Sequence, residues 1–110
     1  MDEIEFRNFL NKTGFDVAYS HFPDNRTPPF ICFTQSKQTE GADNKNLLMW
    51  FDYNVELYTE KKDIAAEKKI EYLLNTAGID FTAETVWIEE SGIFVTYYNV
   101  RLYKKIGGNV

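Results

Sequence analysis

Residues 48–77 read LMWFDYNVELYTEKKDIAAEKKIEYLLNTA, and the change of period within this stretch decides the fold. In its first part, apolar and polar side chains alternate, which is the pattern of a strand with one buried face. The alternating apolar residues are Met49, Phe51, Tyr53, Val55 and Leu57. In its second part, the apolar residues recur at the spacing of one helix stripe. They are Ala66, Ile70, Leu73, Leu74 and Ala77. The stretch predicts a strand that leads directly into a helix.

Both ends of this helix have residues that suit a helix terminus. Asp63 can accept a hydrogen bond from a free amide at the start, and Thr59 is a second candidate one turn earlier. Glu67 adds negative charge near the positive end of the helix. Gly78 suits the left-handed backbone position after the last turn.

Residues 1–13 form the second predicted helix, with Asp2 as its cap and Gly14 at its end. One face of this helix is apolar and carries Phe6, Phe9, Leu10 and Thr13. An amphipathic membrane anchor is the alternative, but the helix is short and its polar face is not basic. We therefore expect this helix to cover part of the core.

Between the two helices, residues 15–20 and 30–35 are predicted to be short strands. The proline-containing residues 21–29 connect them as a turn-rich segment. Residues 36–46 have no large apolar side chain, so we expect a loop there, either a solvated hairpin loop or a functional loop. We also expect this loop to be the most mobile internal segment of the free protein.

Residues 81–88 and 93–104 predict a hairpin around the turn at 89–92. One face of the hairpin suits the core under the helices. It carries Phe81, Ala83, Trp87, Phe94, Tyr98, Val100 and Leu102. We expect Trp87 and Phe94 to be buried together with Ile70 and Leu74 of the central helix.

The other face of the hairpin is apolar near the turn and polar farther away. Its apolar residues are Val86, Ile88, Ile93, Val95 and Tyr97. Such a surface needs a cover, which is either the N-terminal helix or another protein chain. If the cover is another chain, Val95→Asp is expected to weaken self-association and to leave the fold intact.

Length and composition limit the class of protein. The 110 residues correspond to one domain, which we assign to residues 1–105, with 106–110 as a flexible tail. The formal net charge of −5 disfavours binding to a nucleic-acid backbone. No apolar run is long enough for a membrane helix or a signal peptide. The single cysteine, Cys32, excludes an internal disulfide, so we expect a protein of the reducing cytosol with Cys32 as a buried hydrophobe.

The sequence contains no recognisable catalytic centre, and we predict that the protein is not an enzyme. A dyad of His21 and Cys32 is conceivable, but the apolar neighbours of Cys32 argue against an accessible thiolate. Asp63, Glu67 and Glu71 share one helix face away from the apolar stripe, which favours solvated acids. No phosphate loop or metal-ligand spacing occurs, so no cofactor and no metal are expected.

Two passages carry a resemblance to a known family. The passage VELYTEKKD, residues 55–63, leads from strand to helix, and WIEESGIF, residues 87–94, forms the hairpin turn. With the PFICFTQS segment before them, they resemble tail-completion proteins of long-tailed phages and prophages of Gram-positive bacteria. These are tail-terminator or head–tail joining subunits. The resemblance covers roughly residues 29–105.

The resemblance implies a mixed sheet with two helices, a ring-forming homo-oligomer with a hexamer as one candidate, and binding to tail-tube and head-connector proteins. It implies a structural virion protein, present in the host cytoplasm during assembly and then in the tail or neck. We expect an α+β fold with a mainly antiparallel sheet of about five strands in the order α-β-β-β-α-β-β. The alternative function is a monomeric binding module with an aromatic pocket for a small ligand or peptide.

Within that hypothesis, particular residues are candidates for contact. The expected subunit interface joins the apolar hairpin set to a different surface on the next copy, for which Leu48 and Trp50 are candidates. Residues 37–46 are expected to face a partner. Their candidate contact residues are Lys37, Glu40, Asp43, Asn44 and Lys45.

Overall fold

The computed structural model describes residues 1–42 and 45–106, with side chains for residues 1–39 and 48–103. Two helices and five strands follow one another in the predicted order, which confirms the α+β class. They are α1 (Glu3–Asn11), β1 (Asp16–Tyr19), β2 (Phe30–Ala42), β3 (Lys45–Thr59), α2 (Ile64–Thr76), β4 (Phe81–Ile88) and β5 (Ile93–Ile106). Ile106 still belongs to β5, and residues 107–110 of the expected tail lie outside the described residues.

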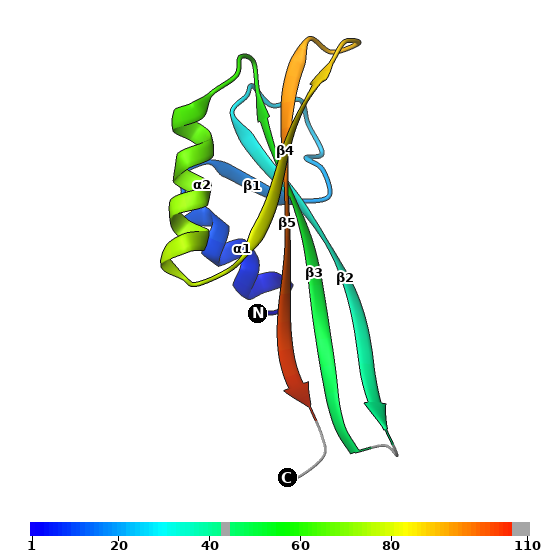
Figure 1. The fold of residues 1–110 in the computed structure, drawn as a ribbon. Helices are drawn as coiled ribbons and strands as arrows, with labels where there is room; N and C mark the ends of the chain where they lie inside the picture. Colours follow the sequence, from blue (N-terminus) through cyan, green and yellow to red (C-terminus); the bar gives the residue numbers. More distant parts are fainter. Residues whose placement is uncertain (43–44, 107–110) are drawn as a thin grey trace.

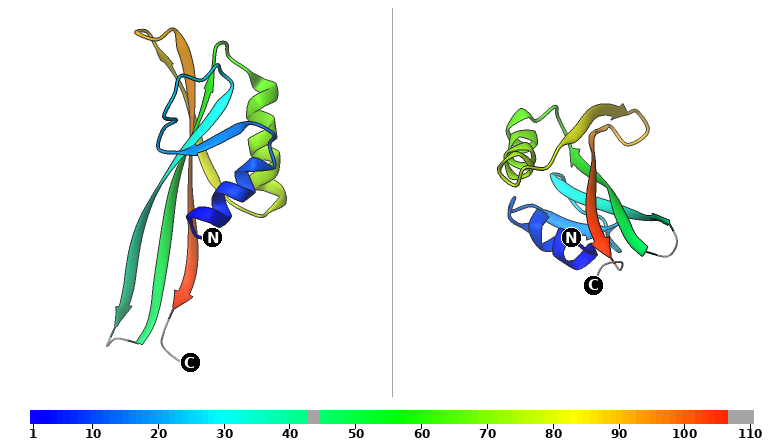
Figure 2. Two further views of the ribbon diagram at one scale, coloured as in Figure 1. Left: turned by 180° about the vertical axis from the view of Figure 1, so that it is seen from behind. Right: turned by 60° about the horizontal axis from the view of Figure 1, so that its bottom comes forward.

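The five strands form one sheet in the order β1-β2-β3-β5-β4. The pairing of β1 with β2 is parallel, and the other three pairings are antiparallel. Both helices lie on the same side of this sheet (Figure 1), and the view from behind shows the same arrangement (Figure 2). We call the side with the helices the covered face and the opposite side the open face.

Helix α2 has the ends that its sequence predicts. The Asp63 side chain accepts a hydrogen bond from the Ala66 amide at 3.0 Å, so Asp63 and not Thr59 is the cap. Gly78 has a φ of +71°, the left-handed position that favours glycine. Ile70 and Leu74 are fully buried, which confirms the predicted phase of the helix.

Helix α1 is anchored in the core by its aromatic residues. Asp2 and Glu5 form a reciprocal capping box at its start. Phe6 and Leu10 are fully buried, and the Phe6 ring stacks on Tyr53 of β3 with 3.8 Å between ring centroids. Since Tyr53 is on the covered face, α1 lies beside α2. The alternative that α1 covers the apolar face of the hairpin is therefore wrong.

The polar segment 36–46 is not a loop, as the sequence had suggested. β2 continues to Ala42 and β3 begins at Lys45, so nearly all of this segment is in a strand ladder. Each of residues 36–40 faces a β3 residue, and the ladder bonds the backbone groups of alternate residues, while the side chains of residues 36–39 stay exposed. Residues 43–44 lie outside the described residues, so the mobility prediction for this segment stays a prediction.

The predicted core cluster is half wrong. Ile70 and Leu74 are buried as expected, but Trp87 is 49% exposed and Phe94 is only partly buried. The two rings contact one another, with 4.8 Å between centroids. The hairpin of β4 and β5 extends past the first turn of α2 in Figure 1, so neither described helix lies over its tip.

The molecule is elongated, with principal extents of 50 × 28 × 22 Å. At one end, β2, β3 and β5 extend well beyond both helices (Figure 1). We call this extension, residues 38–42, 45–50 and 103–106, the three-stranded arm. It places a long stretch of sheet outside the helix layer.

Candidate interaction face

The open face has an apolar end and a polar centre, because alternate residues of each strand point to it. The ladder register brings Val86 opposite Val95 and Ile88 opposite Ile93 at the apolar end. We call the predicted set Val86, Ile88, Ile93, Val95 and Tyr97 the apolar patch. The structure therefore brings together these five side chains, which the sequence had placed on one face.

Burial within the apolar patch is uneven. Val86, Ile88, Ile93 and Tyr97 are half-buried, but Val95 is only 2% exposed. Val95 lies in a central strand between Val86 on one side and Tyr58 of β3 on the other. The expectation that Val95→Asp leaves the fold intact therefore needs correction, because the substitution would bury a carboxylate among apolar groups.

The segment between β1 and β2, residues 20–29, supplies a cover that the sequence interpretation missed. It runs on the side of the sheet away from the helices (Figure 1; Figure 2). The Phe22 ring meets Phe30 edge to face at 5.4 Å, and Phe30 stacks on Tyr58 at 4.8 Å. The apolar Phe22 inside a turn-rich segment was the one sequence feature that could have indicated this role.

A hollow of about 410 Å³ lies between this segment and the sheet. Aromatic rings form much of its lining, and Ile93 connects it to the apolar patch. Arg26 holds the segment in place by pairing with Asp16 at 3.0 Å and with Asp24 at 2.9 Å. Its guanidinium also lies 4.5 Å from the centre of the Phe22 ring.

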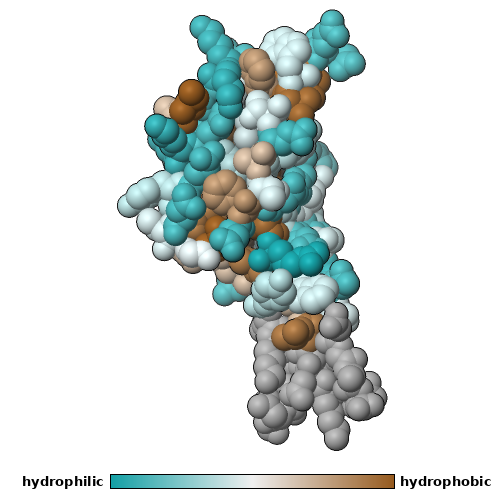
Figure 3. All heavy atoms as spheres, viewed as in Figure 1, coloured by the Kyte–Doolittle hydropathy of each residue, from teal (hydrophilic) through white to brown (hydrophobic). Residues whose placement is uncertain are grey.

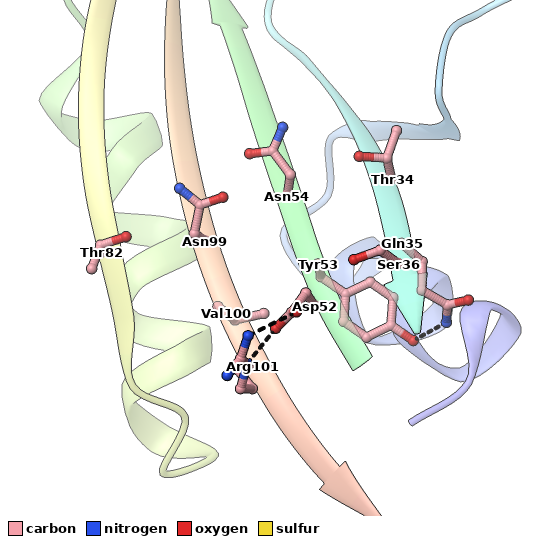
Figure 4. Close-up of a pocket in the computed structure, with 10 residues that line it drawn as sticks. All are labelled: Thr34, Gln35, Ser36, Asp52, Tyr53, Asn54, Thr82, Asn99, Val100 and Arg101. Carbon is pink, nitrogen blue, oxygen red and sulfur yellow. Dashed lines mark hydrogen bonds and ion pairs between the residues drawn. The ribbon is translucent and has the colours of Figure 1, made fainter. Parts of the chain in front are cut away.

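Below the apolar patch, the open face forms a polar groove of about 510 Å³ across four strands (Figure 4). Hydroxyl and amide side chains dominate its lining. Those on the open face are Thr34, Ser36, Asn54, Thr82 and Asn99, with the ion pair of Asp52 and Arg101. In Figure 4 the helices lie behind the sheet, so the groove faces solvent.

The pair of Asp52 and Arg101 joins β3 and β5 across this groove. Arg101 donates from Nε and Nη2 to the two carboxylate oxygens at 2.6 and 3.0 Å. This bidentate hydrogen bond holds the pKa of Asp52 below its ordinary value. Because both side chains are substantially exposed, the pair orders the surface more than it stabilises the fold.

Leu48 and Trp50, the candidates for the second contact surface, lie on the open face beyond the polar groove. Trp50 meets Tyr103 edge to face at 5.9 Å, and the Arg101 guanidinium lies 5.0 Å from the Trp50 ring centre. The indole Nε1 of Trp50 is buried without a hydrogen-bond partner among the described residues. Leu48 is partly exposed. The open face thus has apolar side chains at both ends.

The expected partner-facing residues fall in strands. Lys37 is an exposed residue of β2 on the covered face, opposite Phe51. The backbone of Glu40 pairs with Leu48, and that of Lys45 pairs with Ala42. Asp43 and Asn44 lie outside the described residues.

All three helix carboxylates have a hydrogen-bond or ion-pair partner, contrary to the expectation of solvated acids. Glu71 accepts a hydrogen bond from the hydroxyl of the buried Tyr98 at 2.9 Å, and Glu67 pairs with Lys62. Burial, together with the Glu71 bond, raises the pKa of Tyr98. Asp63, the third, is the helix cap. Glu71 thus links α2 to Tyr98 of β5, and Glu67 and Asp63 stabilise the first turn of the helix.

His21 and Cys32 both line the aromatic hollow, but among the described residues no hydrogen bond joins them. His21 is exposed, and its Nδ1 is 3.2 Å from the Ser20 hydroxyl. Cys32 is a free thiol that is 3% exposed, as predicted for a buried hydrophobe. Burial, with a smaller effect of Glu56, raises the pKa of Cys32 to about 11. The thiolate that a nucleophile needs is therefore disfavoured.

In the described ranges, 1–42 and 45–106, no group of three or more His, Cys, Asp or Glu side chains is arranged to hold a metal ion. Neither α1 nor α2 has the length and apolar character needed to cross a membrane.

Comparison of the chain with profiles of known protein families gives no match, and a search among curated protein sequences also gives none.

Proposed function

We propose that the protein is a structural subunit of a phage tail or neck, which acts in tail completion or head–tail joining by assembling into a ring. The observation that carries this proposal is the large area of sheet without a helix cover. The open face and the three-stranded arm together make up most of the length of the molecule (Figure 1). Such a surface is suited to protein–protein contact.

The chemistry of the open face supports a role in contact. Interfaces combine an apolar, aromatic centre with a polar surround. Here the half-buried residues of the apolar patch adjoin the polar groove, and Trp50 and Tyr103 lie at its far end. On the side that Figure 3 shows, hydrophobic side chains occur in small separate spots. This pattern suits reversible assembly better than permanent aggregation.

The position of Leu48 and Trp50 limits how the open face can be used. They lie on the same face as the apolar patch, so contact between the two surfaces would bring two copies face to face, an arrangement with a two-fold axis. A ring needs two different surfaces on opposite sides of the subunit. In this proposal, the open face therefore binds the tail tube or head connector, and another surface joins the subunits.

Deletion of the gene from the phage or prophage that carries it tests the proposed function. We expect induced cells to contain heads and tails that do not join into complete particles, as seen by electron microscopy. A plasmid copy of the wild-type gene should restore joined particles. Normal particles after deletion would contradict the proposal, as would a gene position inside a metabolic operon.

A second candidate function rests on the hollow at residues 20–29. Its volume of about 410 Å³ and its rings Phe22, Phe30 and Tyr58 suit the side chain of a peptide or a small aromatic ligand. In that case the protein would act as a monomer. A mass measurement in solution separates the two functions, because the first predicts association that strengthens with concentration.

A further inference from the structure

The three-stranded arm has an open strand edge on each side. β1 pairs with residues 30–33 of β2 only, which leaves the outer edge of residues 34–42 without a neighbouring strand. β4 pairs with β5 only as far as Val100, which leaves residues 101–106 open on the opposite side. Open edges of this length are unusual, because they offer backbone groups to any passing strand.

On β2, hydrogen bonds show which backbone groups point outward. The Ser20 amide donates to the Phe33 carbonyl at 2.7 Å, and the Gln35 amide donates to the Tyr19 hydroxyl at 3.1 Å. Phe33 and Gln35 therefore direct their backbone groups away from β3. The backbone groups of successive residues in a strand point alternately to one neighbour and the other, so those of Lys37 and Thr39 also point outward. No described residue hydrogen-bonds to their outward groups.

The same alternation continues across the sheet to β5. Because Phe33 and Gln35 point outward, Thr34 bonds inward to its partner Asn54 of β3. Tyr53 then bonds toward Val100 of β5, its partner on the other side. Residues one position away from Val100 on β5 therefore point outward. Along the open edge of β5, the alternating outward residues are therefore Arg101, Tyr103 and Lys105.

We propose that neighbouring copies join edge to edge along the open segments 34–42 and 101–106, with β2 of one copy pairing with β5 of the next. The outward backbone groups of Lys37 and Thr39 would bond to those of Arg101 and Tyr103 in the adjacent copy. β2 and β5 run in the same direction, since both are antiparallel to β3. Copies related by rotation and placed side by side therefore form a parallel join. This inference rests on the proposed function and names the contact that closes its ring.

A second copy of the chain is the occupant that satisfies both edges. The open segments, residues 34–42 and 101–106, lie on opposite sides of the sheet, so each copy offers one free edge on either side, and each edge carries both N–H donors and C=O acceptors. A two-fold pairing of β2 with β2 would leave the β5 edge open. Head-to-tail addition leaves neither of these two segments open once the ring closes.

Proline substitutions at the outward positions test this pairing. Thr39→Pro and Tyr103→Pro each remove one outward amide that makes no bond within the described chain, and edge strands tolerate proline. We expect each to weaken self-association by about tenfold or more, in sedimentation equilibrium over a range of concentrations. Thr39→Ala and Tyr103→Ala keep the amide and should associate nearly as the wild type does. Circular dichroism and melting temperature verify that each variant is folded.

A mixture of the two proline variants distinguishes the direction of pairing. Thr39→Pro keeps an intact β5 edge, and Tyr103→Pro keeps an intact β2 edge. Together they should form a one-to-one dimer that grows no further, at concentrations where each variant alone is monomeric. If Tyr103→Pro dimerises by itself, β2 pairs with β2 and the head-to-tail inference is overturned.

The remaining outcomes separate this inference from the proposed function. A wild-type protein that remains monomeric at millimolar concentration overturns edge pairing, whereas the deletion experiment still decides the function. Wild-type association that both folded proline variants retain also overturns edge pairing, but it leaves a ring made through another surface.

Discussion

The covered face and the open face of the sheet share the same strands but use them differently. On the covered face, large side chains such as Phe33, Tyr53 and Tyr98 are fully enclosed by two helices. On the open face, hydroxyl and amide groups surround the pair of Asp52 and Arg101, and all residues of the apolar patch except Val95 are half-buried. One face thus supplies most of the stability, which leaves the other available for contact.

The largest expected effect comes from the covered face. Leu74→Ala should lower the free energy of unfolding by about 2–5 kcal/mol, because Leu74 is fully buried in the core. Tyr72→Ala on the same helix is the control, since Tyr72 is 71% exposed, and its effect should stay within about 0.5 kcal/mol. Urea denaturation measures both. Equal effects would remove the distinction between the two sides of α2.

The next effect tests whether every residue of the apolar patch is accessible on the open face. Val95→Asp should destabilise the fold by about 1–3 kcal/mol, because Val95 is buried between its strand neighbours. Ile88→Asp, at a half-buried position of the same patch near the hairpin turn, should cost clearly less. If Val95→Asp is as stable as the wild type, the apolar patch is more accessible than its burial indicates.

A smaller effect concerns Tyr98 at alkaline pH. Its raised pKa means that the unfolded chain loses this proton first as pH rises above the ordinary value of 10. The free energy of unfolding should therefore be unaffected by this group below that pH and should decrease above it. Tyr98→Phe should lose about 1 kcal/mol at neutral pH through the Glu71 bond, and then decline less steeply with alkali. Parallel slopes in urea titrations would contradict this.

The smallest expected effect belongs to the exposed pair on the open face. The pKa of Asp52 is lowered mainly by the Arg101 hydrogen bond, so the pair contributes stability above the ordinary Asp pKa of 3.8. That contribution is lost as pH falls through the lower folded value. Asp52→Asn should remove this part of the acid dependence, and salt should reduce it in the wild type. Melting curves from neutral to acidic pH would show it, and a Tm change as large as that of Leu74→Ala would contradict it.

Much of the fold could be predicted because local chemistry determines it. Asp2 and Asp63 cap their helices, and Gly14 and Gly78 end them with a positive φ, as their positions indicated. The alternation from Met49 to Leu57 correctly placed one side of β3 in the core. In each case a residue and its near neighbours along the chain carry the information.

What could not be predicted depends on contacts between distant segments. Residues 36–42 have the composition of a loop, and their strand conformation comes from pairing with β3. The position of Phe22 on the open face follows from the path of residues 20–29, which no local pattern encodes. Trp87 was expected in the core because it lies on the side of the hairpin that faces the helices. Its exposure reflects the position of α2, whose first turn does not reach as far as the hairpin tip.

Cys32 gives the molecule a built-in chemical reporter. It is the only cysteine in the chain, and it lies in β2 on the open face, close to the segment of residues 20–29. With its thiol buried and its pKa raised to about 11, alkylating reagents should react with it only when this region opens. The labelling rate, compared with that of a small free thiol, therefore measures the free energy of local opening in the intact protein. Any partner that binds over residues 20–29 should slow that reaction, so one mass-spectrometric assay can detect contact without an added label.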